Sequence, residues 1–131
     1  MTINEYLEDN ILLLTASPVV EHIQIIKRRE AENDGYFRAR TKLIDEGLLE
    51  ISIYCRYEEG ATHLIEYRFH WQDKDSNLIM RWDNARHHPA VKTFPHHIHT
   101  GKDETVGECE GIDLLGVLNK ITSAIDKDGE A

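Results

Sequence analysis

The chain has 131 residues, of which 30% are charged, and its formal net charge at pH 7 is −9. This length fits one compact domain spanning residues 1–131, and the negative charge argues against a protein that coats nucleic acid nonspecifically. No apolar run approaches the roughly eighteen residues that a membrane span needs. The chain has two cysteines and shows no export signal, so we expect a cytoplasmic protein without a membrane partner.

The first expected element is a short amphipathic helix over Asn4–Leu14, which ends before Ser17 and Pro18. From Val19 to Asp83, β-branched and alternating apolar residues predict strands, and clusters of Gly, Asp, Glu and Asn predict the turns between them. The expected strands are Val19–Arg29, Tyr36–Ile44, Leu49–Tyr57, Thr62–Gln72 and Leu78–Asp83.

The last two of these strands form the most informative hairpin. Because side chains alternate between the two faces of a strand, residues of the same parity share a face. The core-facing set is Ile65, Tyr67, Phe69, Trp71, Leu78, Met80 and Trp82. Any register that keeps these apolar residues together also gathers a polar set on the opposite face. That polar set is Glu66, Arg68, His70, Arg81 and Asp83.

Residues 84–107 show no clean period and contain Pro89 and Pro95. A loop of this length in a small domain is usually functional, so we expect a functional His-rich loop here. The segment Ile112–Ile125 then has an apolar stripe at helical spacing, which predicts a helix that covers the sheet. The predicted class is α+β, with an antiparallel meander sheet of about five strands and one N-terminal and one C-terminal helix packed on it.

Charge is distributed unevenly along the chain. The segment from Arg68 to Lys102 contains six Lys or Arg residues and three Asp, a local net charge of +3 that leaves −12 for the rest. Strand alternation also places several cations on the non-core face of the sheet, namely Arg38, Arg40, Lys42, Arg56, Arg68 and Arg81. An Arg-rich face suits a phosphate-bearing ligand, and a solvated sheet face of mixed charge is an equal alternative.

Six of the eight histidines lie between Phe69 and His99. Because the unperturbed pKa of histidine is near neutral, such a cluster indicates proton transfer or a metal site. The run His96-His97-Ile98-His99 has spacings that place imidazoles on one ion, and His87, His88 or Asp83 could complete the shell. Cleavage of RNA by its own 2′-hydroxyl instead needs a base, an acid and cations that stabilise the charge on phosphorus.

Three motifs stand out in this region: Y-R-F-H-W-Q-D at Tyr67–Asp73, R-W-D-N-A-R-H-H-P at Arg81–Pro89 and T-F-P-H-H-I-H at Thr93–His99. Their order and spacing resemble the TumE-like toxin family of type II toxin–antitoxin systems. The resemblance implies a growth-inhibiting toxin that acts on RNA and is neutralised by a small antitoxin encoded beside it.

We therefore predict a metal-independent endoribonuclease toxin without a cofactor. The candidate acid–base residues are His70, His88, His96 and His97, with Asp83 orienting a histidine or an arginine, and the candidate phosphate ligands are Arg68, Arg81 and Arg86. The expected partners are an RNA substrate and a small helix-turn-helix antitoxin, and a homodimer is left open. The alternatives are a metal-dependent hydrolase that uses His96, His97 and His99, and a nonenzymatic binding module that acts through a partner.

Overall fold

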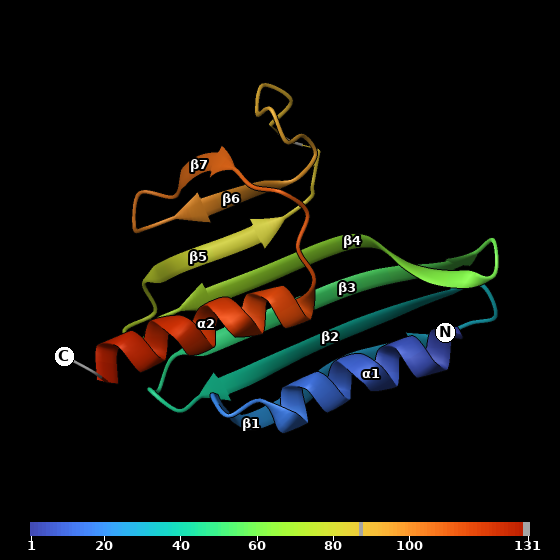
Figure 1. The fold of residues 1–131 in the computed structure, drawn as a ribbon, viewed down its shortest axis with the longest axis horizontal. Helices are drawn as coiled ribbons and strands as arrows, with labels where there is room; N and C mark the ends of the chain where they lie inside the picture. Colours follow the sequence, from blue (N-terminus) through green and yellow to red (C-terminus); the bar gives the residue numbers. More distant parts are fainter. Residues whose placement is uncertain (87, 130–131) are drawn as a thin grey trace.

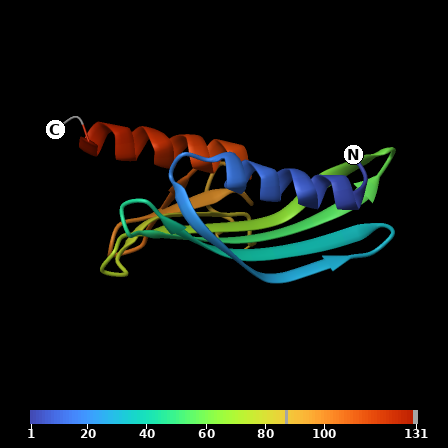
Figure 2. The same ribbon diagram turned by 90° about the horizontal axis from the view of Figure 1, so that it is seen from below.

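The computed structural model describes residues 1–86 and 88–129. It contains one seven-stranded antiparallel sheet whose strands lie side by side in chain order. Two helices, one at each end of the chain, lie on the same face of this sheet (Figures 1 and 2). The predicted α+β class with an antiparallel meander is therefore confirmed.

The N-terminal helix α1 spans Ile3–Ala16 and the C-terminal helix α2 spans Leu114–Gly129. The strands are β1 (Val20–Glu30), β2 (Asp34–Leu43), β3 (Leu48–Glu58), β4 (Ala61–Gln72), β5 (Leu78–Asp83), β6 (His97–Thr100) and β7 (Thr105–Glu108). A capping box starts α1, because the Thr2 hydroxyl accepts from the Glu5 amide while the Glu5 carboxylate accepts from the Thr2 amide.

The hydrophobic core lies between the helices and the sheet. In β2 the apolar parity is buried while Arg38, Arg40 and Lys42 are exposed on the opposite face. Trp71 of β4 and Trp82 of β5 are both buried and stack with their ring centroids 6.5 Å apart. The parity predicted for the last hairpin is therefore confirmed at its two largest side chains.

The turn between β3 and β4 consists of Glu59 and Gly60, which have φ values of 54° and 83°. Two successive residues with positive φ are typical of the tight hairpin turn whose twist matches that of the flanking strands. This turn fixes the register of the long central hairpin that carries Arg68.

The prediction of about five strands was too low. Strands β6 and β7 lie within residues 84–107, where a loop was expected, and extend the sheet beyond β5. Each has only four residues, and the single apolar residue of β6, Ile98, packs against the core. Four residues with one apolar position give too short an alternation to indicate a strand.

A second correction concerns Ile65, which was expected on the core face. A register shift between Tyr54 and Cys55 pairs Tyr54 with Glu66 but Cys55 with Leu64. The bulge leaves Ile65 as the extra residue of β4, so Leu64 packs against the core and Ile65 lines the opposite face.

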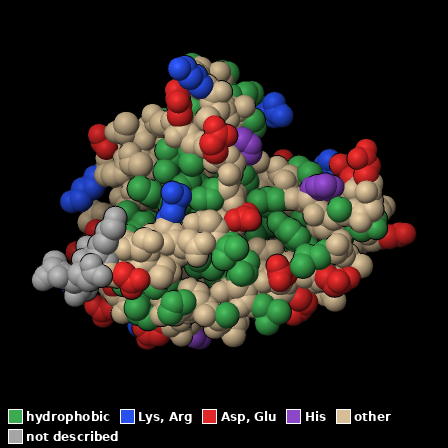
Figure 3. All heavy atoms as spheres, viewed as in Figure 1, with side chains coloured by type: hydrophobic (Ala, Val, Ile, Leu, Met, Phe, Trp, Pro, Cys, Tyr) green, Lys and Arg blue, Asp and Glu red, His purple; other side chains and the backbone are tan. Residues whose placement is uncertain are grey.

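The two faces of the molecule differ in charge. The face that carries the helices shows more acidic than basic side chains (Figure 3), whereas the open face of the sheet carries the arginines of β2, β3, β4 and β5. No helix among the described residues is long and apolar enough to cross a membrane.

Candidate functional site

The register of the sheet aligns polar residues of neighbouring strands into rows on the open face. One row runs Arg38, Ser52, Arg68, Asp83 and His97 across β2 to β6. The next row runs Arg40, Glu50, His70, Arg81 and His99. Because adjacent strands are about 4.8 Å apart, each row brings residues that are far apart in sequence side by side.

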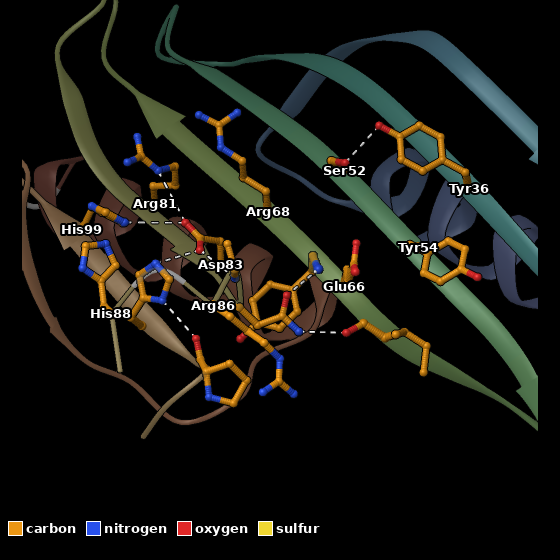
Figure 4. A pocket seen from close by; sticks show the side chains of 16 residues that line it. Tyr36, Ser52, Tyr54, Glu66, Arg68, Arg81, Asp83, Arg86, His88 and His99 are labelled. Carbon is orange, nitrogen blue, oxygen red and sulfur yellow. Dashed lines mark hydrogen bonds and ion pairs between the residues drawn. The ribbon is translucent and has the colours of Figure 1, made fainter. Parts of the chain in front are cut away.

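A cavity of about 990 Å³ lies over these rows. One side of the cavity is lined by arginines and histidines of β4, β5, β6 and the loop after β5. The other side, the tyrosine part, is lined by residues of β2 and β3 (Figure 4). The polar and aromatic lining residues are Tyr36, Ser52, Tyr54, Glu66, Tyr67, Arg68, Arg81, Asp83, Asn84, Arg86, His88, His97 and His99.

Asp83 and His97 form the buried centre of this site. The Asp83 carboxylate is 2.7 Å from His97 Nε2 and also accepts from the Ala85 amide at 3.1 Å. The other nitrogen of His97, Nδ1, is 3.0 Å from the Pro95 carbonyl oxygen. Each ring nitrogen of His97 therefore lies within hydrogen-bonding distance of an oxygen atom, and the two contacts hold the ring in one orientation.

Two further imidazoles surround this pair. The centroid of the His88 ring is 4.8 Å from that of His97 and 5.6 Å from that of His99. His99 Nε2 is 3.6 Å from the second carboxylate oxygen of Asp83. Burial, and next the adjacent Arg81, lower the pKa of His99 below its ordinary value, so its ring is neutral near pH 7 and has a lone pair to accept a proton.

The three arginines predicted as phosphate ligands all line the cavity. Arg81 is the most constrained, with Nε 3.7 Å from Asp83 and Nη1 2.9 Å from the exposed Glu104. The Arg86 guanidinium lies over the Phe94 ring, 5.5 Å from its centroid. Arg68 is exposed, and none of the ion pairs formed within the described part of the chain involves it. Its guanidinium is therefore available to an anion.

Two of the predicted acid–base candidates lie outside this cavity lining. His70 occupies the second row, where its Nε2 is 3.0 Å from the Gln72 side chain. His96 immediately precedes β6 and points to the opposite side of the sheet, where its Nδ1 is 2.7 Å from the Tyr67 hydroxyl. Burial raises the pKa of Tyr67 to about 12, so this hydroxyl remains protonated. The structure brings His88, His97 and Asp83 together and separates His96 and His70 from them.

The sequence interpretation placed His99 only in the alternative metal site, and it did not single out Tyr36 or Ser52, which also line the cavity. Alternation along His97-Ile98-His99 was the signal that pairs His97 with His99 on one face. It also excludes His96 from that face, because adjacent residues of an extended segment point in opposite directions.

The residues that could hold a metal ion differ from the predicted set. Side-chain nitrogens of His88, His97 and His99 all lie within 4.8 Å of one another, whereas His96 of the predicted set faces away. His87, considered as a further ligand, lies outside the described residues. Both nitrogens of His97 already contact protein acceptors, so metal binding through His97 requires the loss of its contact with Asp83 or with Pro95.

Comparison with known proteins gives one match. The family model described as toxin TumE matches residues 9–127, a span that contains every strand of the sheet and the residues that line the cavity. No curated protein and no solved structure matches the chain. The match confirms the resemblance carried by the three motifs and extends it well beyond them.

Proposed function

The chain belongs to the TumE toxin family, and on this premise we propose that it is an endoribonuclease that cleaves RNA without a metal ion. Membership of the family makes the chain a toxin with an antitoxin partner. The single observation that supports ribonuclease chemistry is the cavity in which His88, His99 and three arginines converge around the buried Asp83–His97 pair.

The two outer histidines fit the two proton transfers that this reaction needs. His99 is neutral and faces the cavity, so it takes the proton from the ribose 2′-hydroxyl as general base. His88 is only partly buried on the cavity wall, so it can hold a proton and give it to the leaving oxygen. A bond forms between O2′ and phosphorus, the bond between phosphorus and O5′ breaks, and the products are a 2′,3′-cyclic phosphate and a 5′-hydroxyl.

The arginines stabilise the charge that develops on the phosphoryl oxygens. Arg81 lies beside His99 and is held by Asp83 and Glu104, so its guanidinium is preorganised. Arg68 and Arg86 are exposed at the cavity and fit the flanking phosphates. The buried His97 and Asp83 act as positioning residues, because each already contacts the other.

A metal-dependent hydrolase is the second candidate, and the three-histidine group supports it. We favour the metal-independent reaction because His97 is committed to Asp83 and Pro95, so that two of the three histidines in this group, His88 and His99, are free imidazole ligands. Two imidazoles are fewer than the three protein ligands typical of catalytic zinc sites.

The test is cleavage of unstructured RNA by protein purified without a histidine tag, with EDTA present. We expect products that carry 2′,3′-cyclic phosphate ends. His88→Ala and His99→Ala should each lower the rate by about 10²–10⁴-fold, while His22→Ala, which lies on the edge strand β1 away from the cavity, should not change it.

Two results would overturn the proposal. Full activity of folded His88→Ala and His99→Ala proteins would remove the acid–base assignment. Activity lost in EDTA and restored by zinc or manganese, with one ion per chain that disappears in His99→Ala, would replace it with the metal-dependent reaction.

We further propose that the antitoxin is a small protein with a helix-turn-helix domain, encoded beside this gene. Coexpression of the neighbouring open reading frame should restore growth, and its protein product should copurify with the toxin. Growth inhibition that persists despite expression of that neighbour would contradict this assignment.

A further inference from the structure

The tyrosine part of the cavity has no role in the proton transfers above. Tyr36 of β2 and Tyr54 of β3 are directly paired across the two strands, and both line the cavity. Figure 4 shows them beyond Ser52 and Arg68, on the side of the cavity opposite the histidines. We call these two residues the tyrosine shelf.

Both rings of the tyrosine shelf are held at their hydroxyl ends. The Tyr54 hydroxyl donates to Asp34 at 2.9 Å, and the Tyr36 hydroxyl is 3.1 Å from the Ser52 hydroxyl. Each ring also has a cation near it, Arg56 over Tyr54 at 5.7 Å and Lys27 over Tyr36 at 5.6 Å. Rings fixed in this way lose little conformational entropy when a flat partner stacks on them.

The distance from the tyrosine shelf to the arginines and histidines of the cavity fits the spacing of neighbouring nucleotides. Arg68 is one strand away from Ser52 and lies between the tyrosines and Asp83. The shelf on β3 and the histidines on β6 are three strands apart, which is about 14 Å at the usual strand spacing. A phosphate at the histidines therefore leaves room for a neighbouring nucleotide whose phosphate reaches Arg68 and whose base reaches Tyr54.

We propose that the tyrosine shelf is a base-stacking subsite for single-stranded RNA, which holds the base of a nucleotide next to the cleaved phosphate. This inference rests on the proposed ribonuclease activity, and it specifies the substrate as unpaired RNA. Unpaired bases expose their faces to aromatic side chains, whereas the bases of a duplex are already stacked on one another.

The shelf also has a hydrogen-bonding group beside it. Glu66 of β4 is directly paired with Tyr54, is exposed and lines the same cavity. A carboxylate next to a stacked base accepts from its amino groups, so a base with an exocyclic amine is favoured in this subsite.

The experiment measures binding separately from cleavage. A fluorescent single-stranded RNA of mixed sequence, methylated on every 2′-hydroxyl so that it cannot be cleaved, is titrated with protein and followed by anisotropy. Because stacking contributes about 1–3 kcal/mol per base, Tyr54→Ala should weaken binding by about 5- to 150-fold. Tyr54→Phe keeps the ring and loses its hydrogen bond to Asp34, so it should weaken binding much less than Tyr54→Ala does.

The matched control is Tyr57→Ala. Tyr57 belongs to the same strand but has the opposite parity, is exposed, and is not among the residues that line the cavity, so its removal should leave binding unchanged. Tyr36→Ala and Tyr54→Leu serve as second variants, and circular dichroism checks the fold of each. A blunt duplex of the same sequence should bind more weakly than the single strand and should respond little to Tyr54→Ala.

The outcomes separate this inference from the proposed function. Wild-type protein that fails to bind the single strand, or that binds it as tightly after loss of either shelf tyrosine, overturns the subsite, whatever the cleavage assay shows. Tight binding that depends on Tyr54, without cleavage of unmethylated RNA, supports the subsite and overturns the ribonuclease.

Discussion

Replacing Asp83 by Asn tests the buried pair at the centre of the site. The substitution removes the carboxylate 2.7 Å from Nε2 of His97, a residue that is 2% exposed, and so breaks this buried pair. Loss of one partner of a buried ion pair costs about 3–5 kcal/mol. The Asn side-chain oxygen can still accept one hydrogen bond, worth about 1 kcal/mol. We therefore expect the free energy of unfolding at pH 7 to fall by about 2–4 kcal/mol.

The assay is urea denaturation followed by tryptophan fluorescence, since the buried Trp82 immediately precedes Asp83. Glu104→Gln is the matched control, because it removes the exposed carboxylate that pairs with Arg81 on the other side. An exposed pair of this kind contributes about 0–1 kcal/mol. If Asp83→Asn changes the unfolding free energy by no more than Glu104→Gln does, the buried pair does not organise the site.

Three further predictions concern activity and packing. Arg81→Ala should abolish growth inhibition on induction, because loss of a charge-stabilising donor costs about 10²–10³ in rate, while cells expressing His22→Ala should still fail to form colonies. Burial and Arg81 lower the pKa of His99 below its ordinary value of 6.5, so this base stays neutral as the pH falls to about 6.5 and the acidic limb of the cleavage rate should lie below that pH; an acidic limb that already begins near pH 8 would refute this role. Gly47→Ala places a Cβ 2.8 Å from the Gln72 carbonyl oxygen and should lower the unfolding free energy by about 1–3 kcal/mol in urea titrations, with cleavage per folded molecule unchanged.

The central hairpin was predictable because its apolar residues alternate with polar ones along both strands and all lie on one face. The strand Leu78–Asp83 has the predicted bounds, and Trp71 and Trp82 are buried while Arg68 lies on the other face. A shift of one residue would have buried Arg68 and exposed both tryptophans, so burial alone fixes the register. Two of the arginines predicted to bind phosphate, Arg68 and Arg81, follow from the same parity.

The histidine assignments were less predictable because they depend on the short strand β6. In a segment predicted as a loop, side chains have no expected alternation between two faces. His96 and His97 therefore appeared equivalent in the sequence. Pairing with β5 sets His97 opposite Asp83 and His99 opposite Arg81, and this pairing depends on contacts between residues that are distant in the chain. His96 instead packs on Tyr67, with ring centroids 5.8 Å apart, and belongs to the support of the site.

The acidic composition is compatible with a phosphate-binding cavity because of where the charges lie. Glu5 and Asp9 are exposed on α1, which lies on one face of the sheet (Figure 2), whereas the cavity lies over the other face. A carboxylate on the outer side of a helix is at least a helix diameter, about 10 Å, from the sheet. That distance exceeds the Debye length of about 8 Å at physiological ionic strength, so these charges are largely screened from a phosphate in the cavity. The nearby arginines act over contact distances and are not screened in this way, and local charge rather than net charge therefore decides whether the cavity attracts an anionic strand.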